Sequence, residues 1–418
     1  MASLAPLSVA VVEPAWAARV VSPPYDALTS DQRRAHLEAN PDSFLAVTRS
    51  ATDLAPADRA AGVDPLPGSV AALRRLVRLG AYGPASSRLL VYRLTEGDTH
   101  QTGVVGGLAV ADYRDGLIRT HEEVDPARVG VLARDLAVQG IQSSPITVAR
   151  RADASLDAAV AGATVGPPLL RLSSGDGLTQ EVWELPDPGG RVVRATAQHP
   201  LYIIDGHHRA AAASRWAAAP DAPAAARWML GVVFDAAEMA STAFHRRLPR
   251  DDPDRVRAEV AARFPVREVD PGWAAPTDAD DATRNGHGPD RPVLPGQGPD
   301  ELVLVARGRT YLVTVPPVTV AGDPAGFDAL DTVRLQRAVL GPVLGVAEPD
   351  VGGRIEYRPA LDRPGDGPVP SEDDRAWWLM RPTPTAVLLD AADAGVLMPP
   401  KSTYFAPKTR SGLLLRRL

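Results

Sequence analysis

The stretch His199–Ala213 reads H-P-L-Y-I-I-D-G-H-H-R-A-A-A-A, and it carries the clearest structural pattern in the sequence. The apolar run Leu201–Ile204 is typical of a buried strand, the pair Asp205 and Gly206 breaks that run, and the alanine-rich segment 209–219 favours a helix. The stretch therefore predicts a strand, a tight turn and a helix in direct succession.

The start of that helix is a predicted anion site. A helix N-terminus presents backbone N–H groups and a partial positive charge, which together favour a phosphate. Gly206 allows a sharp turn or a close approach to a ligand. One acidic, two imidazole and one guanidinium side chain gather there, namely Asp205, His207, His208 and Arg209. Bringing so many polar groups together costs free energy unless a ligand binds them. The alternative is an exposed turn with solvated side chains.

The composition is that of an ordinary globular protein. Of 418 residues, 45% are hydrophobic and 23% are charged, and the net charge is −6. This balance gives no support to nonspecific binding of nucleic acid or anionic membranes. Cysteine is absent, which excludes disulfides, zinc–thiolate sites and thiol nucleophiles. Without a long apolar run or a signal-peptide pattern, we expect a cytoplasmic protein that binds neither nucleic acid nor membrane; a homodimer is compatible with the sequence.

Two polar clusters precede the central stretch. The segment V-V-S-P-P-Y-D at 20–26 holds Tyr25 and Asp26 at a rigid corner, which is either structural or faces a substrate. The segment L-I-R-T-H-E-E-V-D at 117–125 places His121 and Glu122 at the end of a predicted strand. An adjacent histidine and carboxylate act as a base with its orienting partner, or form a polar loop.

Two further clusters follow it. His245 and Arg246 form a basic group that either faces a phosphate or is a solvated turn. The tail M-P-P-K-S-T-Y-F-A-P-K-T-R-S-G-L-L-L at 398–415 combines cations, hydroxyls and rings. Lysine, hydroxyl and arginine side chains suit the recognition of a ribose-phosphate or a carboxylate, and the tail offers Lys401, Ser402 and Thr403, with Lys408 and Arg410 nearby. The alternative is a tail strand that anchors the fold. Pro276–Asp300 is predicted to be a flexible loop or linker.

Several nucleotide-binding motifs are missing from the sequence. It contains no G-x-x-x-x-G-K-[ST], no convincing G-x-G-x-x-G and no kinase-type H-R-D or D-F-G. Walker-type and protein-kinase chemistry therefore have no support.

Five ordered motifs carry a family resemblance. P-P-Y-D, T-H-E, H-P-L-Y-I-I-D-G-H-H-R, F-H-R and M-P-P-K-S-T-Y-F-A-P-K, from about Val20 to the last residues, closely resemble the family catalogued as domain of unknown function 1015. D-G-H-H-R is similar to the phosphate cradle of the ParB/sulfiredoxin-like superfamily. The resemblance implies an α+β (mixed α/β) fold, with a ParB/sulfiredoxin-like nucleotide-binding core, large elaborations and mixed sheets. Sulfiredoxin needs a cysteine in its cradle, so its reaction is excluded here.

Three regions are expected along the chain. Residues 1–115 are predicted to be an N-terminal α/β region and 116–250 the core with the D-G-H-H-R cradle. Residues 251–418 are predicted to be a C-terminal α/β region that closes with P-P-K-S-T-Y-F.

The resemblance also implies a function, because family members resemble free serine kinases. It implies phosphoryl transfer from ATP or ADP, with Mg²⁺, to the hydroxyl of free L-serine or a similar small metabolite. The implied catalytic residues are Glu122 as general base, Asp205 beside the reacting hydroxyl, and His208. The resemblance also places His208 and Arg209 in the phosphate-binding part of the cradle. Together with the residue patterns above, the predicted nucleotide-binding residues are Gly206, His207, His208, Arg209, His245, Arg246, Lys401, Ser402 and Thr403. The local patterns alone predict the substrate-binding residues Tyr25, Asp26 and His121. The alternative is a nucleotide-binding switch or regulatory protein, and a phosphodiesterase or nuclease comes third because the acidic chain has no basic stripe.

Overall fold

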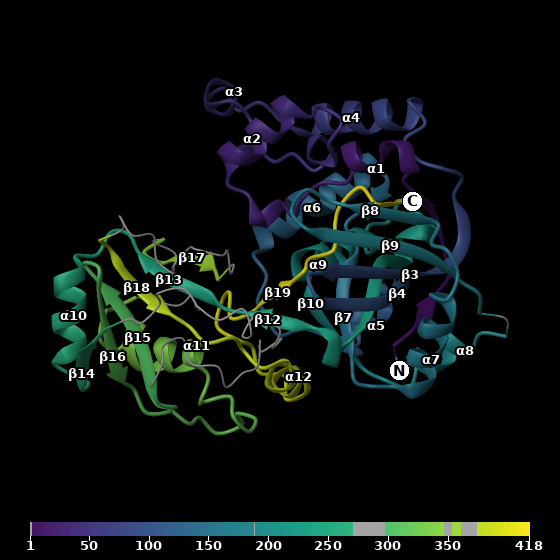
Figure 1. The fold of residues 1–418 in the computed structure, drawn as a ribbon. Helices are drawn as coiled ribbons and strands as arrows, with labels where there is room; N and C mark the ends of the chain where they lie inside the picture. Colours follow the sequence, from purple (N-terminus) through teal and green to yellow (C-terminus); the bar gives the residue numbers. More distant parts are fainter. Residues whose placement is uncertain (1, 188, 271–296, 347–352, 361–373) are drawn as a thin grey trace. The chain divides into compact units, whose positions relative to one another are not determined.

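The computed structural model describes residues 2–187, 189–270, 297–346, 353–360 and 374–418, without the side chains of Asp26 and Ala240. They form two compact units (Figure 1). Unit 1 comprises Met1–Thr120, Val124–Met239 and Pro407–Leu418; unit 2 comprises His121–Glu123 and Ala240–Ala406. Each unit contains helices and sheets, which confirms the predicted mixed α+β class. The division into three regions stays a prediction, and residues 276–296 of the predicted loop lie outside the described part.

Unit 1 is built on one large mixed sheet. Its main path is β5 (Ile118–Arg119), β10 (Leu201–Asp205), β7 (Ile146–Arg150), β11 (Trp228–Asp235), β4 (Thr99–Ala109), β3 (Ser86–Glu96), β2 (Leu7–Val11), β20 (Leu414–Arg417) and β6 (Ile141–Gln142). Further strands join β4 and β3, namely β1 (Leu4–Ala5) on β4, β9 (Leu178–Leu185) on β3 and β8 (Leu170–Ser173) on β9. β10 runs parallel to β5 and antiparallel to β7, so the predicted mixing of strand directions is present.

Strand β10 is apolar because both of its faces are covered, and each residue of Leu201–Ile204 is buried. Leu201, Ile203 and the helix residue Ala213 are buried in one cluster with residues of β4, β7 and β11. A strand buried on both sides needs a continuous apolar run and not an alternating one. The run Leu201–Ile204 was therefore a sound predictor of a buried strand.

Unit 1 also contains helices, several of which pack against this sheet. They are α1 (Pro14–Val20), α2 (Ser30–Ala39), α3 (Pro56–Ala60), α4 (Leu66–Arg78), α5 (Val110–Arg114), α6 (Pro126–Gln139), α7 (Ala154–Ala163), α8 (Arg191–Thr196) and α9 (His207–Ala217). Short 3₁₀ turns occur at Tyr25–Ala27, Phe44–Ala46, Ala51–Asp53, Ala224–Arg227 and Ala236–Glu238. α6 and α9 pack through small and large apolar side chains such as Val129, Ala133, Ala212 and Trp216. The alanines let the two helices approach closely.

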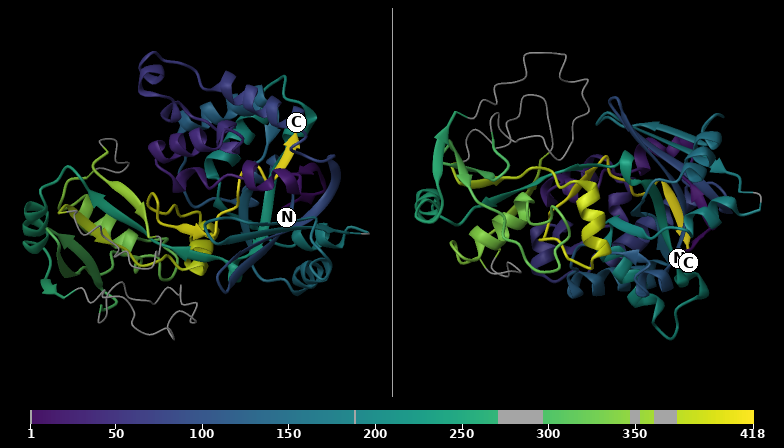
Figure 2. Two further views of the ribbon diagram at one scale, coloured as in Figure 1. Left: turned by 45° about the horizontal axis from the view of Figure 1, so that its top comes forward. Right: turned by 90° about the horizontal axis from the view of Figure 1, so that it is seen from below.

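The last strand of the chain belongs to unit 1. β20 pairs with β2 and β6, and Figure 2 shows it in yellow among strands from early in the chain. A terminal strand anchoring the fold was one of the two predictions for the tail.

Unit 2 holds a six-stranded antiparallel sheet. Its order is β14 (Val266–Val269), β16 (Arg309–Thr314), β15 (Glu301–Ala306), β18 (Ala376–Leu379), β13 (Phe244–Leu248) and β17 (Glu356–Pro359). A separate pair joins β12 (Ala240–Thr242) to β19 (Tyr404–Ala406). The helices are α10 (Pro253–Ala261), α11 (Asp331–Arg334), which continues as a π-helix over Leu335–Leu340, and α12 (Thr385–Asp393). In the described part of the chain, no helix has both the length and the apolar character to cross a membrane.

Candidate functional site

The predicted strand, turn and helix are all present around Gly206. β10 ends at Asp205 and α9 begins at His207, two residues before the predicted helix start. Gly206 has φ 104°, a left-handed conformation that other residues rarely adopt. A Cβ atom at Gly206 would lie 3.0 Å from the Nε and Nη2 atoms of Arg209. The turn therefore requires glycine both for its backbone and for the space that Arg209 occupies.

Asp205 is the charged centre of this turn. Its Oδ1 atom accepts a hydrogen bond from Lys408 Nζ at 3.0 Å, and its Oδ2 atom accepts one from Arg209 Nη2. Burial raises the pKa of this carboxyl group, but the positive charges of Lys408 and Arg209 outweigh burial and hold the pKa well below its usual range. The carboxylate is therefore ionised and holds two cations at the start of α9.

Arg209 is held from two sides. Besides its ion pair with Asp205, its Nη1 atom donates to the carbonyl oxygen of Pro145 at 2.7 Å, in the loop before β7. Its side chain is 28% exposed. The guanidinium thus has a defined orientation while part of its surface still meets solvent.

His208 connects α9 to the segment that follows T-H-E-E. Its Nε2 atom accepts a hydrogen bond of 3.0 Å from the backbone N–H of Asp125. Asp125 caps α6 by accepting from the N–H of Ala127 through Oδ1 at 2.8 Å. Because Nε2 accepts, the ring proton of neutral His208 lies on Nδ1. The neighbouring His207 is buried at the first position of α9.

His121 and Glu122 belong to unit 2, although Thr120 and Val124 on either side belong to unit 1. His121 is buried, and its carbonyl oxygen accepts from the N–H of Met398 at 2.8 Å. This contact joins T-H-E to the residue that opens M-P-P-K. Two of the quoted motifs therefore meet within unit 2.

His245 and Arg246 lie on β13 and are both buried. His245 Nδ1 accepts from the N–H of Met380 at 3.1 Å. Burial, with a smaller contribution from the charge of Arg246, lowers the pKa of His245 to about 4, so this histidine is neutral at neutral pH. The basic cluster is therefore not a solvated turn.

The guanidinium of Arg246 binds backbone carbonyl groups. Its Nη2 atom donates to Pro400 at 2.9 Å, and its Nη1 atom donates to Lys401 at 3.0 Å and to Phe244. Burial lowers its pKa to about 10, which leaves it charged at neutral pH. The buried Arg246 thus joins the F-H-R and P-P-K motifs through hydrogen bonds from its guanidinium group to backbone carbonyl groups.

The residues after Pro400 form a tight turn in unit 2. Lys401 has φ 54°, and its ammonium group lies 5.5 Å from the ring centroid of Phe244. Ser402 Oγ donates to the carbonyl of Pro399 at 2.6 Å, so this hydroxyl closes the turn. Thr403 follows and is partly exposed. Nucleotide binding by these residues stays a prediction.

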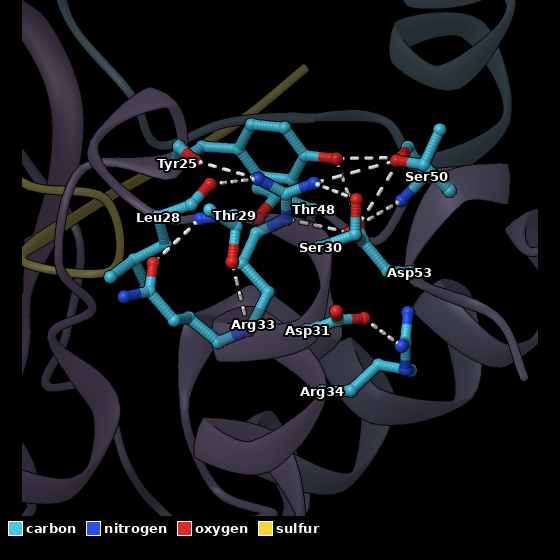
Figure 3. A network of polar contacts seen from close by, with 12 residues as sticks. Tyr25, Leu28, Thr29, Ser30, Asp31, Arg33, Arg34, Thr48, Ser50 and Asp53 are labelled. Carbon is cyan, nitrogen blue, oxygen red and sulfur yellow. Dashed lines mark hydrogen bonds and ion pairs between the residues drawn. The ribbon is translucent and has the colours of Figure 1, made fainter. Parts of the chain in front are cut away.

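Tyr25 lies in a network of local polar contacts, shown in Figure 3. Its hydroxyl group is 2.6 Å from Ser50 Oγ and donates to Asp53 Oδ2 at 2.8 Å. Arg33 lies over its ring at 3.9 Å from the centroid and donates through Nε to Asp53 Oδ1 at 2.6 Å. These contacts support the structural alternative for this corner. The side chain of Asp26 lies outside the described part.

Lys408 is the site residue that the predicted set lacked. The tail motif includes Lys408 as a neighbour of Lys401, Ser402 and Thr403, but only those three are predicted nucleotide-binding residues. A usable signal exists in the sequence, because lysine occurs only at positions 401 and 408 in a chain rich in arginine. Lysine presents a compact charge that arginine does not reproduce, so these two positions differ chemically from the other basic positions of the chain.

Comparisons with known proteins give one family and several distant structures. The family model described as "Protein of unknown function (DUF1015)" matches residues 5–333. A free serine kinase in complex with AMP has a TM-score of 0.34 and 14% identity, over 73% of this chain and 87% of that chain.

Two further solved structures are similarly distant. SbnI with a C-terminal truncation, from Staphylococcus aureus, has a TM-score of 0.36 and 10% identity over 73% of this chain and 85% of that chain. A conserved hypothetical protein from Pyrococcus furiosus has a TM-score of 0.35 and 12% identity over 74% and 93%. No curated protein matches the chain.

Proposed function

The chain belongs to the protein family of unknown function DUF1015, and from that premise we propose that it transfers a phosphoryl group from ATP or ADP to the hydroxyl of free L-serine or a similar small metabolite. The observation that supports this proposal best is the turn between β10 and α9. There the ionised Asp205 holds Lys408 and Arg209 at a helix N-terminus.

This turn suits the phosphate groups of a nucleotide. Lys408 and Arg209 come from segments about 200 residues apart in sequence, so the fold has brought two cations to one place. The N-terminus of α9 adds a partial positive charge, and the missing Cβ of Gly206 allows the backbone to approach an anion. Asp205 offsets the repulsion between the two cations when no phosphate is bound.

Glu122 is the proposed general base, a role implied by the family resemblance. Its neighbours along the chain support this role. β5 is the parallel partner of β10, with Arg119 opposite Tyr202, so both strands end at the same sheet edge. Three residues after Glu122, Asp125 is hydrogen-bonded to His208 on α9. The unit 1 residues that flank 121–123 in the chain are thus held beside β10 and α9.

The proposed phosphoryl transfer uses one base and a set of positive groups around the phosphate. The oxygen of the acceptor hydroxyl forms a bond to the terminal phosphorus, and the bond from that phosphorus to the leaving nucleotide breaks. The leaving nucleotide keeps the electron pair of the broken bond, and the hydroxyl proton passes to Glu122. Lys408, Arg209 and the start of α9 stabilise the negative charge on the transferred group.

A magnesium site would need carboxylate oxygens supplied by this chain. This ion is usually held by one or two carboxylates together with substrate phosphates. Among the described residues there is no group of three or more His, Asp or Glu side chains that could hold a metal ion. Both oxygens of Asp205 already accept from cations. The described residues therefore do not form a magnesium cage, and Mg²⁺ stays a prediction.

The test of the reaction is product formation by the purified full-length chain. With ATP or ADP, Mg²⁺ and L-serine, mass spectrometry should detect O-phosphoserine. Glu122→Ala should lower turnover by about 10²–10⁴-fold while nucleotide affinity is retained. Glu123→Ala is the control because it removes the same charge from the exposed neighbouring residue. Equal losses in both variants would contradict the assigned base.

The test of the phosphate site is nucleotide affinity measured by calorimetry. Lys408→Ala should weaken binding by about tenfold or more, because it removes a charge-assisted contact to phosphate. Arg171→Gln, a charge loss at a 68% exposed position of unit 1, is the control. Failure of ATP and ADP to bind would refute the site. Binding without turnover of L-serine or other small hydroxyl compounds would instead favour the nucleotide switch.

A further inference from the structure

A separate polar pocket lies within unit 1, and none of its lining residues belongs to the turn Asp205–Arg209. Its volume is about 280 Å³, and it lies between the end of α1, α2 and the turn that joins β8 to β9. Its polar lining residues are Ser22, His36, Ser173, Ser174, Asp176 and Arg410. The pocket is therefore large enough for a small metabolite and is lined by both charged and hydroxyl side chains.

Arg410 is the buried cation of this pocket. The residue is 8% exposed, and its backbone N–H donates to the hydroxyl oxygen of Tyr92 at 3.4 Å. Its Nη2 atom donates to Asp176 Oδ2 at 2.5 Å. Its Nε atom is buried and has no hydrogen-bond partner among the described residues. A buried donor of this kind is unfavourable unless an acceptor from a ligand or a water molecule meets it.

Asp176 supplies the opposite charge. It lies in the turn between β8 and β9, which is closed by a hydrogen bond from the N–H of Gly177 to the carbonyl of Ser174 at 3.1 Å. Its side chain is 48% exposed, in contrast to the buried Arg410. One oxygen contacts the guanidinium, and the exposed part of the carboxylate is accessible to a second cation.

The segment that carries Arg410 is well anchored. The next residue, Ser411, accepts through its carbonyl from the N–H of Ser22 at 3.0 Å, and its Oγ is 2.5 Å from Ser144 Oγ. His36, on α2, is 3.1 Å from Ser43 Oγ through Nε2. The pocket walls are thus joined by hydrogen bonds before any ligand binds, which lowers the ordering cost of binding.

The pairing of charges selects a class of ligand. A simple anion at Arg410 would be repelled by Asp176, and a simple cation at Asp176 would be repelled by Arg410. A small zwitterion meets both groups and adds no net charge to the pocket. We propose that this pocket binds a small α-amino acid, with its carboxylate at Arg410 and its ammonium group at Asp176. This inference does not rest on the proposed function.

The experiment measures binding to the nucleotide-free, full-length chain by calorimetry. The probes are glycine and L-alanine, which have no hydroxyl group and so cannot act as phosphoryl acceptors. Acetate, methylammonium, glycerol and inorganic phosphate are the comparison ligands. We expect both amino acids to bind, and each comparison ligand to bind about tenfold more weakly or worse, because it lacks one charge or both.

Variants locate the site. Asp176→Asn, at an exposed position, should weaken glycine binding by about tenfold or more. Glu184→Gln is the matched control, because Glu184 is 53% exposed and pairs with Arg88 elsewhere in the unit. Arg410→Lys should also weaken binding, with circular dichroism to confirm folding. The proposal is overturned if neither amino acid binds, if Asp176→Asn behaves like Glu184→Gln, or if phosphate or glycerol binds as tightly as glycine.

Discussion

At the scale of single residues, burial decides what the polar side chains can do. Asp205 stays ionised because two cations contact it, whereas His245 is kept neutral chiefly by burial. Arg246 remains charged, but its donors go to backbone carbonyls. The three polar side chains thus have different roles: Asp205 is a charged partner of two cations, His245 is a neutral hydrogen-bond acceptor, and Arg246 binds the backbone.

The neutral state of His245 makes unit 2 sensitive to acid. The folded pKa of about 4 lies below the unfolded value of about 6.5, so acid protonates the unfolded chain first. This contribution to stability is complete above about pH 6.5 and is lost as the pH falls toward about 4. Between about pH 7.5 and about pH 5 it should lower the free energy of unfolding by about 2 kcal/mol.

The measurement is urea unfolding at both pH values. His245→Asn removes the titrating group, so the difference between the two pH values should shrink by about 2 kcal/mol relative to the unmodified chain. His100→Asn, at an exposed position, is the control. An equal pH dependence in the unmodified chain and in His245→Asn would show that burial does not hold this histidine neutral.

At the scale of elements, glycines in β4 set how closely its neighbours approach. A Cβ atom on Gly106 would lie 2.7 Å from Leu4 Cδ1 and 2.9 Å from the carbonyl oxygen of Ala5. That carbonyl belongs to β1, which pairs with β4, so it cannot move away without disturbing the pair. The close contact of β1 and β4 therefore depends on glycine.

Gly106→Ala should accordingly destabilise the protein by about 1–3 kcal/mol, the usual cost of overpacking a buried site. Gly68→Ala is the comparison, since Gly68 lies in α4 with no atom near its missing Cβ. That change should stabilise the protein by up to about 1 kcal/mol, because alanine favours a helix. Thermal unfolding should show shifts of opposite sign, and shifts of equal sign would refute the steric argument.

At the scale of the molecule, unit 1 is assembled from separated parts of the chain. The chain between Met239 and Pro407 forms nearly all of unit 2, and after it the chain returns to unit 1 and ends in β20. The same return segment carries Lys408 to Asp205 and Arg410 to its pocket. The segment Pro407–Leu418 thus contributes a strand to the sheet of unit 1 and residues to both the proposed phosphate site and the proposed amino-acid pocket.

Leu414→Ala should therefore destabilise unit 1 selectively. Leu414 is 1% exposed in β20, and such a truncation typically costs about 2–5 kcal/mol. Hydrogen exchange should become faster in β7 and β10 and stay unchanged in β15 and β16 of unit 2. Leu304→Ala, at a fully buried position of β15, should give the reverse pattern. Equal acceleration in both units would mean that they unfold as one.

The sequence by itself determined the features that depend on local pattern. It predicted the strand, turn and helix around Gly206, because an apolar run, a chain-breaking pair and an alanine-rich segment each report on neighbouring residues. The mixed fold class and the family were also predicted, and both are confirmed. The roles of Glu122 and the other assigned residues stay predictions.

Only the tertiary structure decided which side chains meet. Lys408 reaches Asp205 across 203 positions of sequence, and the hydroxyl of Tyr25 is bound by Ser50 and Asp53. No local pattern reports such contacts, because they depend on how segments distant in sequence fold against one another. The carboxylate of Asp205 and its local partner Arg209 can be read from the sequence, but the second cation, Lys408, reaches Asp205 only through the tertiary fold.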